Sequence, residues 1–348
     1  MKLKKLGNSD LFVSPYCLGT MTFGEATSEK DSHLQIDESL SSGVNFIDTA
    51  EMYPTCPLKP ETTGNTEKII GNWIEKNQSK RSEFILATKI SGIGYKAVRN
   101  GEGINEKSIR IALEGSLKKL KTDYIDLYQL HWPNRGSYHF RQNWTYNPSN
   151  QETNKAKENI YLVMETLSVL QKEGKIRSLG LSNETCWGSI QFINCLKSFP
   201  NLSIASIQNE YSLLCRLYDL DMAELSYHEN ISLLAYSPLA GGFLTGKYLN
   251  ENIPKNSRLS RVPSLFGRIN DNSTPAVKEY INLAKKYHLD PIHMSLAFCN
   301  QRPFMGSVIY GATTLTQLKN ILQGIEVVLS DDILIEINKL YKKYPITF

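Results

Sequence analysis

Short runs rich in Ile, Leu, Val and aromatic residues alternate along the chain with longer segments whose apolar positions recur every three or four residues. The runs are typical of buried strands, and the longer period is typical of helices with one buried face. This alternation indicates successive βα units on a parallel sheet. Two short antiparallel strands are predicted first, in KLKKLGNSDLFVS (2–14). Eight further strands are predicted at residues 16–21, 45–50, 84–89, 125–131, 176–182, 204–210, 231–237 and 307–313.

The clearest predicted helix is INEKSIRIALEGSLKKL, residues 104–120. Asn105 is placed to cap its first turn, and Ile109 and Leu113 lie on one helical face. Eight βα units in a chain of this length favour a closed (β/α)8 TIM barrel over an open doubly wound sheet. We therefore expect residues 1–348 to form a single α/β domain.

Two polar segments interrupt the alternation. Residues 133–159 follow the fourth of the eight strands, and residues 241–275, rich in Gly, Ser, Asn, Pro and Arg, follow the seventh. Loops of this length inside a compact domain are usually functional or disordered, and barrel enzymes place their sites on the loops at the C-terminal ends of the strands. Both segments are expected on that face. The first carries the aromatic residues Tyr138, Phe140, Trp144 and Tyr146.

Composition limits the classes of partner. The net charge is only +4 over 348 residues, and no basic run is interleaved with aromatic residues, so nucleic acid is not favoured. No apolar stretch is long enough to span a membrane, and MKLKKLGNSD turns polar too early for a signal peptide, so we expect a cytoplasmic protein without a membrane partner. Six cysteines without CxxC spacing favour free thiols over a metal site. Nothing in these patterns specifies an oligomeric state.

Polar side chains stand at the C-terminal ends of the predicted strands, where a packed core would have apolar ones. Asp48, Lys89 and His131 end three consecutive strands, and Tyr53 follows Asp48 in the next loop. Because the strands of a barrel end at one mouth, we expect these side chains to converge there. Later strands end in Ser182 and Asn183, Gln208 and Asn209, and Tyr236.

The first four groups have complementary chemistry. A desolvated lysine beside an aspartate is stabilised as an ammonium, and an ammonium beside a phenol lowers the pKa of the tyrosine from about 10. Tyr53 is therefore expected to act as a general acid tuned by Lys89 and Asp48, while His131 polarises a carbonyl oxygen. The set suits protonation of an alkoxide that forms as hydride arrives. Lys89 could instead form a Schiff base, as in aldolases, if burial depressed its pKa.

Six stretches resemble the aldo-keto reductases and occur in the same order as in that family. They are NFIDTAEMY, LATKI, SLKKLKTDYIDLYQLHWP, GKIRSLGLSN, IQNEYSLL and AYSPLAGGFLTGKY. The resemblance runs from about residue 3 to about residue 330. The segment after HWPNR and the LSNET segment look closest to the bacterial Tas-like branch, and the potassium-channel β subunits are more distant. The resemblance implies a (β/α)8 barrel, an NADP(H) cofactor and a catalytic tetrad at the four positions above. It implies reversible, NADPH-dependent reduction of an aldehyde or ketone to an alcohol. The alternative is an NADPH-binding regulatory or redox-sensing subunit with little turnover.

The resemblance also implies the residues that hold the cofactor. Ser182, Asn183 and Gln208 correspond to positions that hold the nicotinamide carboxamide, and Tyr236 to the ring that stacks on nicotinamide. The loop SPLAGGFLTGKY resembles the segment that wraps the pyrophosphate, where small residues permit close backbone approach and cations neutralise phosphate. The contacts implied by this loop and by the first strand of the barrel are Thr20, Met21, Ser237, Pro238, Leu239, Gly242, Lys247 and Arg258.

The segment YGATTLTQLKNIL resembles the motif at the adenosine end of the cofactor. The family usually has Asn four residues after the Gln of this motif, whereas this chain has Ile321 there and Asn320 one place earlier. Some branches have an Arg in place of the Gln, which would pair with the 2′-phosphate; Arg258 could supply that charge here, which favours NADP over NAD. The implied contacts at this end are Gly311, Thr313, Gln317 and Asn320.

Met52 and Trp132 flank catalytic positions and are the predicted substrate contacts. They indicate an apolar, aromatic-lined pocket suited to aldehydes or ketones. Met21, Trp187 and the aromatic residues of the 133–159 loop are further candidates, although the loop residues could equally pack the loop onto the barrel. No pattern identifies the physiological carbonyl compound.

Overall fold

The computed structural model describes residues 1–249 and 253–348, so residues 250–252 of the predicted 241–275 loop lie outside the described residues. Eight parallel strands close into a barrel in the order β10-β3-β4-β5-β6-β7-β8-β9, which confirms the predicted fold class. All eight predicted runs contain a strand, and the bounds differ by up to three residues. The strands are β3 (Tyr16–Gly19), β4 (Phe46–Asp48), β5 (Ile85–Ile90), β6 (Ile125–Leu130), β7 (Ile176–Ser182), β8 (Ile204–Glu210), β9 (Ser232–Tyr236) and β10 (Met305–Tyr310).

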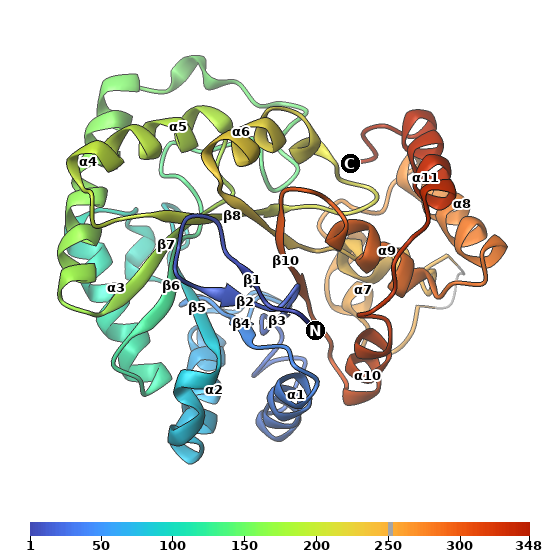
Figure 1. The fold of residues 1–348 in the computed structure, drawn as a ribbon, viewed down its shortest axis with the longest axis horizontal. Helices are drawn as coiled ribbons and strands as arrows, with labels where there is room; N and C mark the ends of the chain where they lie inside the picture. The colour runs from blue at the N-terminus through green and yellow to red at the C-terminus, as the bar shows by residue number, and fades with distance from the viewer. Residues whose placement is uncertain (250–252) are drawn as a thin grey trace.

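Helices α1 to α6 follow one another around the barrel, α10 lies beside α1, and α11 packs against α8 (Figure 1). The expected cap of α3 is present: Oδ1 of Asn105 accepts from the Ser108 backbone N–H at 2.9 Å, and Oγ of Ser108 accepts from the Asn105 N–H at 2.8 Å. The helices are α1 (Glu29–Ser41), α2 (Asn65–Lys76), α3 (Glu106–Leu120), α4 (Thr153–Lys172), α5 (Cys186–Cys195), α6 (Asp221–Glu229), α7 (Arg258–Arg261), α8 (Ser273–Lys286), α9 (Pro291–Asn300), α10 (Leu315–Gln323) and α11 (Asp331–Lys343).

The N-terminal hairpin covers the end of the barrel where the strands begin. β1 (Lys4–Lys5) pairs antiparallel with β2 (Phe12–Val13), as predicted, and in Figure 1 the hairpin lies in front of the barrel. Leu6, Leu11 and Val13 are buried in one cluster with side chains from inside the barrel. The hairpin thus closes one end with apolar contacts and leaves the C-terminal end of the strands to the loops.

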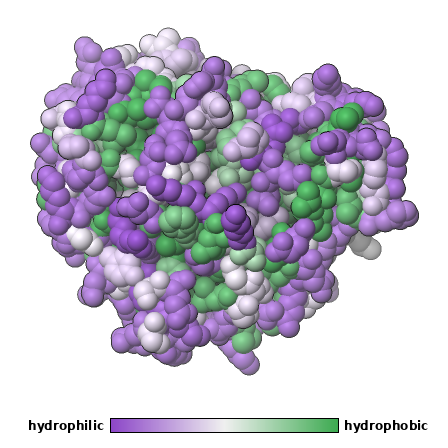
Figure 2. Space-filling model, in the orientation of Figure 1, coloured by the Kyte–Doolittle hydropathy of each residue, from purple (hydrophilic) through white to green (hydrophobic). Residues whose placement is uncertain are grey.

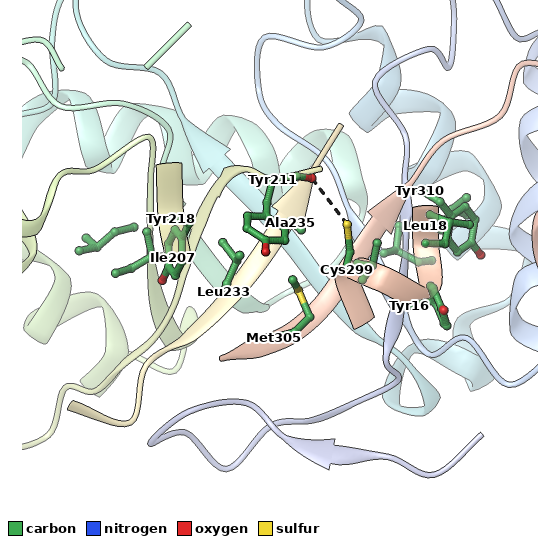
Figure 3. Packing of buried hydrophobic residues seen from close by; sticks show 14 of the residues in the cluster. Tyr16, Leu18, Ile207, Tyr211, Tyr218, Leu233, Ala235, Cys299, Met305 and Tyr310 are labelled. Carbon is green, nitrogen blue, oxygen red and sulfur yellow. Dashed lines mark hydrogen bonds between the residues drawn. The ribbon is translucent and has the colours of Figure 1, made fainter. Parts of the chain in front are cut away.

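The main core lies between the barrel and its helices. Figure 3 shows apolar side chains of β9 and β10 beside Cys299 of α9, whose thiol donates to the backbone carbonyl oxygen of Tyr211 at 3.9 Å. The face seen in Figure 1 is mostly hydrophilic, with apolar side chains scattered among polar ones (Figure 2). No helix within the described residues is long and apolar enough to cross a membrane.

The two long loops differ in part from their predicted extents. Helix α4 begins at Thr153, so the loop after β6 ends seven residues before the predicted boundary at 159. The loop after β9 contains the short helix α7 and ends where α8 begins at Ser273. Both loops follow C-terminal strand ends, on the face that the sequence indicated.

Candidate active site

Three of the four residues expected to do chemistry stand at the C-terminal ends of neighbouring strands. Asp48 is the last residue of β4, Lys89 is the next to last of β5, and His131 directly follows β6. Tyr53 lies in the loop after β4. Lys89 is fully buried and the other three are less than a tenth exposed. These groups are therefore part of the interior and are not solvated charges at the barrel rim.

Two acceptors hold the Lys89 ammonium. Its Nζ donates to Oδ2 of Asp48 at 2.6 Å and to the Thr49 carbonyl oxygen at 2.8 Å. Burial acts to lower the pKa of Lys89, but Asp48 and Tyr53 more than offset it and the pKa is raised. A Schiff-base lysine needs a depressed pKa, so the aldolase alternative loses its physical basis.

Tyr53 lies beside both Lys89 and His131. The Nζ atom of Lys89 is 4.9 Å from the centroid of the phenol ring, and the His131 ring meets the phenol edge-on at 5.8 Å between centroids. Burial raises the pKa of Tyr53, and Lys89 acts to lower it, as expected, but offsets only part of the rise. The expected net pKa below the ordinary value of about 10 is therefore wrong. The phenol therefore carries its proton at neutral pH, as a general acid must.

The imidazole of His131 is neutral at physiological pH. Burial and then the Lys89 charge hold its pKa well below the ordinary value. Within residues 1–249 and 253–348, its buried Nδ1 has no hydrogen-bond partner. Because a buried N–H without an acceptor is rare in folded proteins, we assign the single proton to Nε2. That nitrogen is then a hydrogen-bond donor.

Residues at the ends of β7 to β9 are hydrogen-bonded to this catalytic group. The Tyr236 hydroxyl donates to Oδ1 of Asn183 at 2.7 Å, and Nδ2 of Asn183 donates to the His131 backbone carbonyl at 2.9 Å. Nε2 of Gln208 donates to Oδ1 of Asp48 at 2.9 Å. The structure thus brings the predicted nicotinamide residues into one network with Asp48, Lys89 and His131.

Two further strand-end residues have different surroundings. The Ser182 hydroxyl donates to the Gln208 carbonyl oxygen at 2.9 Å and accepts from the Asn183 side chain at 3.1 Å, so it belongs to the same network. Asn209 instead donates to the Glu184 carbonyl oxygen at 3.1 Å. Its neighbour Gln208 is therefore the member of this pair that joins the site.

The backbone of the loop after β9 is left-handed at several points. Ser237 has φ 55°, Gly241 has φ 71° and Gly242 has φ 93°. At the two glycines a side chain would be strained, which explains the small residues predicted to wrap a pyrophosphate. Leu239 accepts backbone hydrogen bonds from Gly242 and Leu244 at 2.8 and 3.2 Å, which hold the turn.

Two cations border this turn. An ideal Cβ at Gly242 would lie 3.3 Å from Nζ of Lys247. Arg258 contacts Sδ of Met21 through Nη2 at 3.8 Å, and its buried Nε has no hydrogen-bond partner in the described part of the chain. A buried guanidinium nitrogen without a partner fits an anionic ligand such as a phosphate. Thr20, the residue before Met21, is fully buried and donates from Oγ1 to the Asp48 carbonyl oxygen at 2.8 Å.

At the predicted adenosine end, Gln317 and Thr313 lie together. Oε1 of Gln317 accepts from both the backbone N–H and the hydroxyl of Thr313, each at 3.0 Å. Asn320 is held elsewhere: its side chain donates to Asp290 at 3.2 Å and lies 3.0 Å from Nε2 of His293, both on or beside α9. The amide of Asn320 therefore has a structural role in these contacts.

An apolar wall adjoins Tyr53. Met52 and Tyr53 are buried with Val98, and Tyr95 and Trp132 pack against them. The Trp132 indole N–H donates to a backbone carbonyl at 3.1 Å, which fixes the ring. Both predicted substrate residues thus lie on this wall. Val98 and Tyr95 were not predicted as part of this wall. Both lie within the loop after β5, away from any strand end that would locate their side chains in space.

The aromatic residues that were further substrate candidates have different surroundings. The Phe140 ring meets Trp132 edge-on at 6.2 Å, so it adjoins the apolar wall. Tyr138 packs on Tyr146 at 5.9 Å within the loop itself. Trp144 is 62% exposed. The Trp187 ring lies against the Arg135 guanidinium at 5.0 Å.

A cavity of about 370 Å³ lies outside the catalytic group, between the barrel and α4. Its apolar lining includes Leu130, Leu181, Ile160 and Val163. Trp132 and Ser182 also line it, so it adjoins the candidate site, but none of the four catalytic candidates does. No group of three His, Cys, Asp or Glu side chains that could hold a metal occurs among the residues that the structure describes.

Three contacts near the candidate site were not predicted from the sequence. Gln129 of β6 donates to Asp48 at 2.9 Å; it precedes His131 by two residues, so the two-residue period of a strand could have placed it on the same face. Glu210 at the end of β8 pairs with Arg268 at 2.7 Å. Glu51 pairs with Arg99, which ties the loops after β4 and β5. The latter two pairs join distant segments and leave no local signal.

The chain is similar in sequence to known proteins over most of its length. The sequence model of the Aldo/keto reductase family matches residues 15–342. Protein Tas of Escherichia coli is 41% identical over 99% of both chains. An oxidoreductase of Bacillus subtilis, YrpG, is 29% identical over 98% of this chain and 96% of its own. A probable voltage-gated potassium channel subunit beta of rice is 27% identical over 94% of this chain and 92% of its own.

Proposed function

This chain belongs to the aldo/keto reductase family, and on that premise we propose that it reduces an aldehyde or ketone to an alcohol with NADPH. Membership implies oxidoreduction of carbonyl compounds with a nicotinamide cofactor. One observation supports the proposal for this chain: an ion pair, a protonated phenol and a neutral imidazole are buried together, in Lys89 with Asp48, in Tyr53 and in His131.

Each of these groups has a role in the proposed reaction. Bound NADPH would supply hydride to the carbonyl carbon. His131 donates a hydrogen bond from Nε2 to the carbonyl oxygen, and Tyr53 gives its proton to that oxygen as negative charge develops. Lys89 stabilises the phenolate that remains, and Asp48 keeps Lys89 charged.

Residues of this chain fit the cofactor along its length. Ser182, Asn183 and Gln208 would bind the nicotinamide carboxamide, and the Tyr236 ring would stack on the nicotinamide. Lys247 and Arg258 would neutralise phosphates, with the backbone of Ser237, Pro238, Leu239 and Gly242 close by; Thr20 and Met21 adjoin them. Gly311, Thr313 and Gln317 would contact the adenosine. The buried Nε of Arg258, unpartnered within the described residues, supports NADP over NAD.

Met52 and Trp132 would contact the substrate, because both lie on the apolar wall beside Tyr53. Such a wall suits an aromatic or aliphatic carbonyl compound.

We also propose that residues 1–348 form one domain. Near the two ends of the chain, Nζ of Lys4 donates to the Met305 carbonyl at 2.7 Å and Thr347 donates to the Leu214 carbonyl at 3.0 Å.

The proposal is tested by NADPH oxidation with 4-nitrobenzaldehyde, with cofactor fluorescence as a separate measure of binding. Wild type should turn over, and Tyr53→Phe should bind NADPH normally and lose about 100-fold or more in kcat. Tyr128→Phe is the matched control: it removes a buried hydroxyl from β6 that has no partner within residues 1–249 and 253–348. It should keep wild-type activity.

Other outcomes separate the alternatives. NADPH binding without turnover of any of several aldehydes and ketones would favour a cofactor-binding regulatory protein, the alternative suggested by similarity to a probable voltage-gated potassium channel subunit beta of rice. Equal activity in Tyr53→Phe and wild type would remove the acid role. Failure of wild type to bind NADPH or NADH would overturn the proposed function.

A further inference from the structure

Oδ1 of Asp48 accepts hydrogen bonds from two glutamine side chains. Nε2 of Gln129 and Nε2 of Gln208 each donate to it at 2.9 Å, while Lys89 occupies the other carboxylate oxygen. An ionised carboxylate can only accept, so each amide must present its NH2 group to Asp48. The carboxylate thereby determines how both amides are turned.

The two glutamines are also bonded to each other. Nε2 of Gln208 donates to Oε1 of Gln129 at 3.0 Å. Both N–H groups of the Gln208 amide are then used, one by Asp48 and one by Gln129. The atom that remains for a ligand is Oε1 of Gln208, an acceptor, and the carboxamide of nicotinamide offers an NH2 donor.

The barrel makes space for Gln129 at this level. Gln129 is opposite Lys89 of β5 and Gly180 of β7 in the strand register, and its side chain is fully buried. An ideal Cβ at Gly180 would lie 2.9 Å from Cγ of Gln129. A buried amide costs free energy unless it is hydrogen-bonded, and an apolar side chain would fill this interior position without that requirement.

We propose that Gln129 is a positioning residue that turns the Gln208 amide to accept a hydrogen bond from the nicotinamide carboxamide and supports Asp48 as the counter-ion of Lys89. The inference rests on the proposed function, because it assumes that a nicotinamide binds at this mouth. It goes beyond the catalytic and cofactor residues named above, since Gln129 acts through Gln208 and Asp48.

Two substitutions separate the two bonds of Gln129. Gln129→Met keeps the length of the side chain and removes both hydrogen bonds. We expect the Kd of NADPH to rise about fivefold, the equivalent of one hydrogen bond, with the KM of the aldehyde at saturating NADPH within about twofold of wild type. A purely structural role would not divide the two constants in this way.

Gln129→Glu gives the sharper result. A protonated Glu donates to Asp48 and accepts from Gln208, as Gln does, whereas an ionised Glu places a second negative charge beside Asp48. Relative to wild type, kcat and NADPH affinity should be near normal at pH 5.5 and should fall about tenfold or more by pH 8. Because the protonated form reproduces both bonds, this variant should fold at acidic pH even if Gln129→Met does not.

Gln35→Met is the matched control. Gln35 is also fully buried, but in helix α1, and in the described part of the chain neither of its amide atoms has a hydrogen-bond partner. It should leave NADPH affinity and the pH profile unchanged. If wild type binds NADPH and Gln129→Glu follows the wild-type pH profile, the positioning role of Gln129 is overturned while the proposed function stands. If wild type binds neither nicotinamide cofactor, the proposed function falls and this inference falls with it.

Discussion

Nζ of Lys89 lies 2.6 Å from Oδ2 of Asp48 inside the barrel, and both side chains are buried. A buried ion pair is weak evidence for stability, because the desolvation of two charges offsets most of their attraction and an apolar pair of similar volume often does as well. The pair is therefore better explained by what the ammonium does to its neighbour Tyr53, 4.9 Å from Nζ to the ring centroid.

Lys89→Met should impair both stability and turnover. It leaves the Asp48 charge buried without a cation, which should lower the free energy of unfolding by about 3–5 kcal/mol, and kcat should fall by about 100-fold or more. Asp48→Asn with Lys89→Met removes both charges, so urea unfolding should show most of the stability restored while kcat stays low. A double variant as unstable as Lys89→Met would show that the two charges are not coupled.

The barrel was predictable because each strand is a distinct apolar run that ends in polar residues. The β7 and β8 runs were placed to the residue, because apolar residues and glycine make up most of each run before Ser182 and Gln208. The start of α4 was missed for a physical reason: residues 153–159 are almost all exposed, so their first two turns have no apolar period to detect.

Candidate positions could be predicted from the residues at strand ends and shortly after them, as for Tyr53, but not from residues farther along the loops. Asp48, Lys89 and His131 could be found because a strand end locates a side chain in space. The direction of the pKa shift of Tyr53 could not be predicted, because the burial of its side chain depends on packing from other loops. The ion pair of Glu210 and Arg268 joins residues 58 positions apart, and no local pattern connects them.

The buried histidines should make stability depend on pH. Burial lowers the pKa of His139 to about 4 and that of His131 well below its ordinary value. In the unfolded chain each titrates near pH 6.5, so below that pH the unfolded state binds more protons and the free energy of unfolding falls as pH falls. The slope is up to about 1.4 kcal/mol per pH unit for each histidine.

The contribution of His139 is measured by urea unfolding between pH 4.5 and 6.5. His139→Gln should flatten the dependence of the free energy of unfolding on pH by about one histidine's share. The exposed His228 provides the control, and His228→Gln should leave the slope as it is. An unchanged slope in His139→Gln would contradict the assignment.

Arg258 should decide the preference for NADPH. Arg258→Met should raise the Kd of NADPH about tenfold or more and that of NADH much less, if the guanidinium pairs with the 2′-phosphate. Lys255→Met, at an exposed position of the same loop, is the control and should change neither constant. Equal losses for both cofactors would place Arg258 at the pyrophosphate instead.

Trp132 should contribute to substrate binding through its face beside Tyr53. Trp132→Leu should raise the KM for 4-nitrobenzaldehyde several-fold more than the KM for propanal, because an aromatic substrate loses more apolar contact. Trp144→Leu changes the same residue type at a position that is 62% exposed, and should leave both KM values alone. Parallel changes for the two aldehydes in Trp132→Leu would argue against a direct contact.

Glu210 lies between two arginines that should not be equivalent. Arg268 is buried, donates from Nε to Glu210 at 2.7 Å and reaches the Ser237 hydroxyl at 3.3 Å. Arg141 is bonded to the other carboxylate oxygen at 3.0 Å and is 16% exposed. Arg268 therefore supports the loop after β9, for which we propose cofactor binding, whereas Arg141 holds the loop that carries Phe140.

Arg268→Met removes the buried partner and the bond to Ser237, so it should cost about 3–5 kcal/mol of unfolding free energy and weaken NADPH binding. Arg141→Met leaves Glu210 paired with Arg268, so it should cost about 1 kcal/mol or less and leave NADPH affinity unchanged. Its effect should be on the KM of aromatic aldehydes, because Phe140 meets Trp132 edge-on. Urea unfolding, NADPH fluorescence and KM on the two variants check this division, and similar losses of cofactor affinity in both would contradict it.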